Sequence, residues 1–152
     1  MKHRFLLDVM VIYHAIKGVD EAGNPDQTSG ELVRLIGENC HTAVADSEVA
    51  ERYSQHLKEL LSIPSLLYKT TEFLWEVIYN SSKFVAEPSP APELPPGVKV
   101  PREDEYLVRA ALISHPIVVT AEKRVLRDVN SQSVLRLRAV TPAEALKLAK
   151  DT

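Results

Sequence analysis

Short apolar runs alternate with stretches of helical spacing along this chain. Residues 4–13 are apolar on both faces and rich in Val, Ile and Leu, which predicts a buried strand. Shorter runs of the same kind predict three further strands, at residues 41–45, 116–120 and 134–140. Arg136 and Arg138 in the last run alternate with leucines, so we expect them to share the solvated face of an edge strand.

Apolar residues at intervals of three and four predict helices between these strands. The expected helices cover residues 30–40, 47–61, 70–85, 103–115, 121–129 and 141–150. Ser29 or Thr28 is expected to cap the first helix, and Asp46 or Ser47 the second. Strands separated by helices indicate an α/β fold, a three-layer α/β/α sandwich with a mainly parallel central sheet.

The 152 residues are expected to form one domain, residues 1–152, with enough chain to bury a core. The segment 86–101 is rich in proline, which lacks an amide donor and has a fixed φ, so we expect an extended loop there. Too little chain follows this segment to form a second domain. The loop is therefore interpreted as a lid between elements of a single domain.

Composition excludes several classes of protein. Cys40 is the only cysteine, which rules out an internal disulfide framework and a multi-cysteine zinc site. No apolar run reaches the roughly 18 residues of a membrane span, and the run near the N-terminus is too short for a signal peptide, so we expect a cytoplasmic protein. The net charge of −3 is still compatible with nucleic acid if bound metal ions supply positive charge locally.

Asp8 is an acid inside the first apolar run. An isolated charge in a low-dielectric core costs several kcal/mol, so the sequence must provide some solution to the burial of this carboxylate, by stabilising, neutralising or exposing it. Three are open: a cationic partner such as Arg4 or Lys123, protonation, or a position at the end of the strand that faces a ligand. In parallel sheets ligands bind beyond the carboxyl ends of the strands, which favours the third.

Further acids stand where an α/β fold could bring them to Asp8. Asp104 shares the inward face of its predicted helix with Leu107 and Ala111, although acids normally point outward. Glu122 follows the strand at 116–120 by two residues. The first turns of the helix after the second strand hold Glu51, with Asp46 and Glu48 as rivals. Thr120 at a strand end could hydrogen-bond one of these acids or a metal-bound water.

Carboxylates that converge on one site stay ionised only if cations lie among them. Oxygen ligands without a Cys/His pattern favour Mg²⁺ or Mn²⁺, and the chemistry implied is phosphodiester hydrolysis. Lys123, Arg124 and Arg127 are placed near Glu122 to meet an RNA backbone. The hypothesis requires Asp8 and Asp104 to lie close together without a Lys or Arg between them.

The chain resembles the PIN-domain family of metal-dependent ribonucleases, which includes the toxins of VapBC toxin–antitoxin pairs. The resemblance is carried by FLLDVMVIYHAIKG near the start, EDEYLVRAALISHPIVVTAEKRVL late in the chain and AVTPAEAL at the end. It implies that Asp8, Asp104 and Glu122 hold the metal together with a Glu from the middle helix, for which Glu51 is the nearest acid.

Three positions depart from the family pattern. Met10 stands where the family usually has Asn, two residues after its first Asp. Glu122 replaces the usual Asp, and Arg52 occupies the place directly before Tyr53 where the middle Glu commonly lies. These departures concern the site more than the fold.

We therefore expect a VapC-like endoribonuclease that uses Mg²⁺ or Mn²⁺, with Asp8, Asp104, Glu122 and Glu51 as ligands and Thr120 in support. Toxin-type relatives imply a homodimer and an antitoxin protein that covers the site, and no membrane. The departures favour an alternative, a catalytically weakened PIN-like module that binds RNA or a protein without cutting. A third interpretation is an α/β signalling domain with Asp8 as acceptor, for which Lys123 is the only support.

Overall fold

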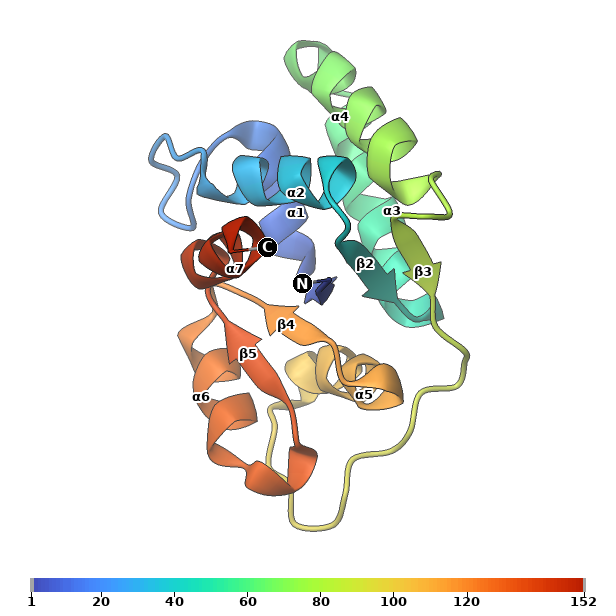
Figure 1. The fold of residues 1–152 in the computed structure, drawn as a ribbon, viewed down its shortest axis with the longest axis vertical. Helices are drawn as coiled ribbons and strands as arrows, with labels where there is room; N and C mark the ends of the chain where they lie inside the picture. Colours follow the sequence, from blue (N-terminus) through green and yellow to red (C-terminus); the bar gives the residue numbers. More distant parts are fainter. Residues whose placement is uncertain (1, 152) are drawn as a thin grey trace.

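A computed structural model describes residues 2–151. Its centre is a sheet of five parallel strands in the order β3–β2–β1–β4–β5 (Figure 1). The strands are β1 (Arg4–Leu7), β2 (Thr42–Ala45), β3 (Phe84–Ala86), β4 (Ile117–Val119) and β5 (Arg138–Val140). The predicted α/β fold with a parallel central sheet is confirmed.

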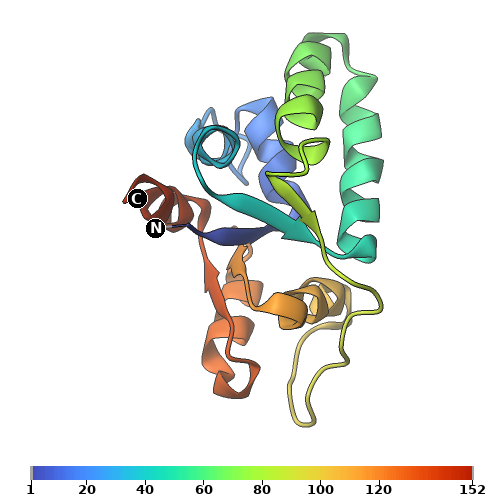
Figure 2. The same cartoon turned by 45° about the vertical axis from the view of Figure 1, so that its right-hand side comes forward.

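Helices cover both faces of this sheet. They are α1 (Val9–Lys17), α2 (Thr28–Glu38), α3 (Ser47–Leu61), α4 (Leu67–Phe73), α5 (Glu105–Ser114), α6 (Lys123–Ser131) and α7 (Pro142–Lys150). Figure 2 shows α1 to α4 on one side of the sheet and α5 and α6 on the other, while α7 packs against α2. None of the helices in residues 2–151 has the length and apolar character that crossing a bilayer requires.

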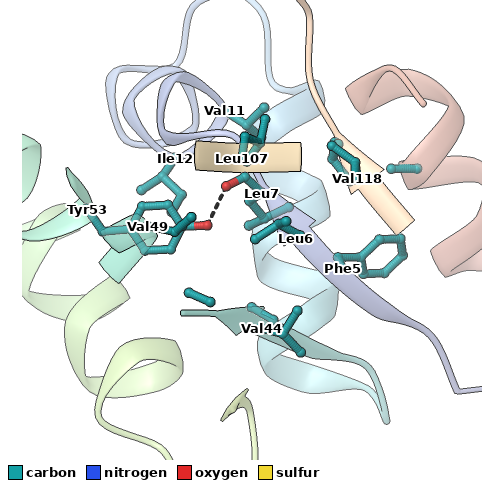
Figure 3. Packing of buried hydrophobic residues seen from close by; sticks show 14 of the residues in the cluster. Phe5, Leu6, Leu7, Val11, Ile12, Val44, Val49, Tyr53, Leu107 and Val118 are labelled. Atoms are coloured by element: carbon teal, nitrogen blue, oxygen red, sulfur yellow. Dashed lines mark hydrogen bonds between the residues drawn. The ribbon is translucent and has the colours of Figure 1, made fainter. Parts of the chain in front are cut away.

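The core forms around β1. Phe5, Leu6 and Leu7 are almost fully buried, because neighbouring strands and both helical layers enclose this strand (Figure 3). A strand covered on both faces has an uninterrupted apolar sequence, which is why this one shows no alternation. The same run continues beyond the strand, however, and there the structure differs from the prediction.

The predicted strand at 4–13 is wrong in its second half. The strand ends at Leu7, and α1 begins directly after Asp8. Val11 and Ile12 are buried on the inner face of this helix, whereas Met10 is 38% exposed. The inward stripe of a helix and a buried strand look alike over so few residues.

Two other element boundaries are corrected. The helix expected over 70–85 ends in a π-helical segment, Leu74–Ile78, and the last residues of the expected range form β3 at the sheet edge. The strand expected over 134–140 is reduced to β5, because a 3₁₀ turn precedes it and Arg136 has a left-handed φ of 53°. Arg136 and Arg138 therefore do not share the face of one strand.

Helix caps agree with the prediction at one site and differ at the other. Asp46 caps α3 and accepts a 2.9 Å hydrogen bond from the amide of Val49, as expected. At α2 the prediction is wrong, because the helix begins at Thr28 with Gln27 as the capping position. The Thr28 hydroxyl instead donates to Asp26 in the preceding loop.

One buried hydrogen bond joins α3 to the end of β1. The Tyr53 hydroxyl donates to the carbonyl oxygen of Leu7, the residue before Asp8 (Figure 3). We expect Tyr53→Phe to lower the free energy of unfolding by about 1–3 kcal/mol, because it takes this donor from a buried carbonyl. Chemical denaturation measures the change. Tyr13→Phe is the matched control: its hydroxyl serves an exposed contact with Lys17, so equal losses in the two variants would contradict the expectation.

Candidate active site

The strand order places a topological switch point between β1 and β4. β1 lies between β2 and β4, so the chain departs in opposite directions from the carboxyl ends of β1 and β4. Asp8 directly follows β1, and Glu122 caps α6 just after β4. Asp104 opens α5 on the far side of the sheet. Open α/β sheets bind ligands at such a switch point.

Thr120 connects two of the predicted site residues. Its hydroxyl donates a 2.8 Å hydrogen bond to Oδ2 of Asp8 and accepts a 3.1 Å bond from the amide of Glu122. The amide of Asp8 is fixed in turn by the Val119 carbonyl at 2.9 Å. The predicted hydrogen bond from Thr120 to an acid is confirmed.

Asp8 is a buried carboxyl group on which the negative charges of other acids act. Burial raises its pKa, and the charges of Glu122 and Asp104 raise it further, while the Thr120 hydroxyl and the Met10 amide act in the opposite direction. The charges of Glu122 and Asp104 thus both act on Asp8. Arg4, one cation considered as a partner for Asp8, lies instead near Glu87, at 3.9 Å.

Asp104 has a cationic partner within the chain. Arg124 on α6 donates to both of its oxygens, from Nε at 2.8 Å and from Nη2 at 3.1 Å. The Asp104 side chain is 11% exposed and that of Arg124 is 39% exposed, so the pair lies at the surface end of the site. Arg124 was expected to face RNA; here it supplies the positive charge that Asp104 would otherwise take from a metal ion. The hydrogen bonds and charge of Asp104 raise the pKa of Arg124. The charges of Glu103 and Glu122 raise it further, so Arg124 also interacts with a second predicted ligand.

The acids of α3 are not drawn into this cluster. Glu51 is exposed, and Asp46, although buried, serves as a helix cap. Glu48 lies 3.6 Å from Arg52 in an exposed pair. The contacts of the structure thus give no support to a ligand from the middle helix.

The donor set is suited to a hard cation but is not closed around one. Within residues 2–151, no three His, Cys, Asp or Glu side chains are arranged closely enough to hold a metal ion. Asp8 and Glu122 line a shared cavity of about 460 Å³, together with Met10, His14 and Lys123. Mg²⁺ commonly binds through one or two carboxylates and completes its shell with water and substrate phosphate. Asp8 and Glu122 fit that mode, whereas Asp104 does not line this cavity and is paired with Arg124.

Comparisons with known proteins do not decide the chemistry of this site. No protein-family model matches the sequence, and no curated protein matches it. A solved structure of a PilT N-terminus (PIN) domain protein from the hyperthermophilic archaeon Sulfolobus solfataricus P2 is similar, with a TM-score of 0.48 and 10% sequence identity. The match covers 100% of this chain and 96% of that chain. At this level of similarity the chemistry of the site has to be inferred from its own residues.

A stacked pair beside the acids was not predicted. Arg52 on α3 lies over the ring of Tyr106 on α5, with Cζ 3.7 Å from the ring centroid. Burial is the main cause that raises the pKa of Tyr106 to about 12; the charge of Asp8 adds to the effect and that of Arg52 opposes it. The departure of Arg52 from the family pattern was the one signal in the sequence. Its partner, 54 positions later, could not be inferred from spacing.

Proposed function

We propose that this protein is a metal-dependent phosphodiesterase that hydrolyses RNA at the carboxyl edge of β1 and β4. The observation that carries the proposal is that Asp8, which is buried, lines one cavity together with Glu122. The charges of Glu122 and Asp104 add to burial in raising the pKa of Asp8. A divalent ion relieves such a concentration of negative charge.

The chain's own residues have distinct parts in this proposal. Asp8 and Glu122 would hold the ion, and the Thr120 hydroxyl fixes the orientation of Asp8 through its 2.8 Å bond. Lys123 lines the same cavity and offers positive charge to a backbone phosphate. Bound Mg²⁺ or Mn²⁺ supplies polarisation of the phosphate and an activated water at neutral pH.

Cleavage of a generic single-stranded RNA tests the proposal. We expect cleavage with Mn²⁺ or Mg²⁺ and none in EDTA. Glu122→Gln should lower the rate by at least about 100-fold, since even outer-shell changes at metal sites cost about 10- to 100-fold. Glu59→Gln, an exposed acid on α3, is the matched control. Equal rates for Glu122→Gln and the wild type would remove Glu122 from the site.

A second candidate is a catalytically weakened module that binds RNA or a protein without cutting. The Arg124–Asp104 pair favours it, since an internal cation occupies one of the expected ligands. Calorimetry with Mn²⁺ separates the candidates. The nuclease should bind the ion and lose that binding in Asp8→Asn, whereas the weakened module should bind RNA and show no heat with Mn²⁺.

The toxin role, the homodimer, the antitoxin partner and the cytoplasmic location stay predictions of the family resemblance and composition. A surface for a partner chain is offered by exposed aromatic side chains around α4: Tyr68 is 77% exposed, Trp75 69% and Tyr79 64%. Trp75 and Tyr79 pack edge to face. Sedimentation of the full chain tests the homodimer.

A further inference from the structure

A second cavity opens beside the acidic site. It has a volume of about 340 Å³ and lies between the start of α3, the proline-rich loop and α5. The polar side chains on its wall are those of Asp46, Ser47, Glu48, Ser89 and Arg109, and Tyr106 forms part of its lining. Asp46 on its wall follows β2, which pairs with β1, so the cavity opens at the same carboxyl edge of the sheet as Asp8.

Its outer wall is held in place by the loop. Arg109 donates to the carbonyls of Pro92 at 2.9 Å and Ala91 at 3.1 Å. The hydroxyl of Ser89 lies 2.7 Å from that of Ser47 at the start of α3. Side-chain donors and acceptors are therefore fixed around the rim before any ligand arrives.

The stacked pair of Arg52 and Tyr106 reaches this cavity through Tyr106. The Arg52 guanidinium covers the Tyr106 ring, yet the Arg52 side chain remains 44% exposed, so its outer plane is accessible. Its ion pair with Glu48, at 3.6 Å, is exposed. Unpaired nucleic-acid bases stack on aromatic rings and on guanidinium planes of this kind.

We propose that the Arg52–Tyr106 pair is a stacking platform for one unpaired base of a single-stranded RNA, with the Ser47 and Ser89 hydroxyls placed to meet the base edge. The choice of RNA rests on the proposed function. A duplex keeps its bases stacked inside, so the platform selects single strands.

Binding of two decamers in EDTA tests the platform without metal chemistry. One is oligoadenylate and the other a ribose–phosphate decamer of the same charge without bases. The wild type should bind oligoadenylate about tenfold more tightly, within the range measured for a stacked base. Arg52→Lys keeps the charge and loses the plane, so it should retain binding of the base-free decamer and lose the preference. Arg34→Ala removes an exposed arginine on α2 and should keep the preference.

Two results would overturn the platform: no preference in the wild type, or a preference that survives in Arg52→Lys. Failure of the nuclease proposal would look different. If the wild type shows an Arg52-dependent preference in EDTA but does not cut oligoadenylate in Mn²⁺, the platform stands and the nuclease proposal fails. If the wild type cuts oligoadenylate but shows no such preference, the nuclease proposal stands and the platform fails.

Discussion

Asp8→Asn is expected to abolish RNA cleavage and, at neutral pH, to stabilise the fold. Burial and two neighbouring carboxylates raise the pKa of Asp8 in the folded chain. Between the unfolded and folded pKa values the folded state binds more protons, so the free energy of unfolding falls as the pH rises through that interval. Asn carries no charge, and its amide oxygen still accepts from Thr120. Opposite effects on activity and stability are typical of a residue kept for function.

Thermal unfolding of both proteins from pH 3 to pH 8 measures this effect. The Tm of Asp8→Asn should exceed that of the wild type by at least about 2 °C at pH 7. The gain should vanish toward pH 3, where Asp8 is protonated in both states. Asp26→Asn is a control of opposite sign, because hydrogen bonds from Thr28 lower the pKa of Asp26 and its ionised form stabilises the fold. A loss of stability in Asp8→Asn at pH 7 would contradict the expected destabilising effect of the ionised Asp8 carboxylate.

Arg124→Met is expected to strengthen Mn²⁺ binding and to lower stability when no metal is present. The substitution keeps an unbranched side chain but removes the guanidinium that binds both oxygens of Asp104. Asp104 then becomes a third free carboxylate for the ion. A partly exposed ion pair has modest strength, so we expect about a fivefold gain in affinity.

The metal-free variant should unfold about 3 °C below the wild type, because a largely buried carboxylate has lost its cation. Saturating Mn²⁺ should restore or exceed the wild-type Tm. Arg127→Met on the same helix serves as control, since Arg127 is 71% exposed and pairs with its neighbour Asp128. Unchanged Mn²⁺ affinity in Arg124→Met would show that Asp104 is no ligand.

The fold was predictable because its determinants are local. Apolar runs separated by helical spacing indicate strands and helices whatever the packing, and the parallel sheet follows from their alternation. Boundaries failed where two elements share one apolar run. At Asp8 the strand stops and α1 begins without a turn, so residues 9–13 look like more strand. Arg136 adopts a left-handed backbone conformation, which its residue type does not predict.

The candidate site was predictable only in part. Asp8, Thr120 and Glu122 follow adjacent strands, so strand ends alone bring them together. The pairs Arg124–Asp104 and Arg52–Tyr106 depend on how α5 packs against α6 and α3, which no spacing in the sequence encodes. The exposure of Glu51, by contrast, agrees with helical spacing, which places it away from the buried stripe of Val49 and Tyr53.

Anomalous diffraction from a crystal of the full chain soaked in Mn²⁺ tests the proposed metal site most directly. We predict a peak between the carboxylates of Asp8 and Glu122, with Asp104 turned toward it and Arg124 displaced when the site is full. Clear density for the chain with no peak at Asp8 and Glu122, and with Arg124 still bound to Asp104 at saturating Mn²⁺, would contradict it.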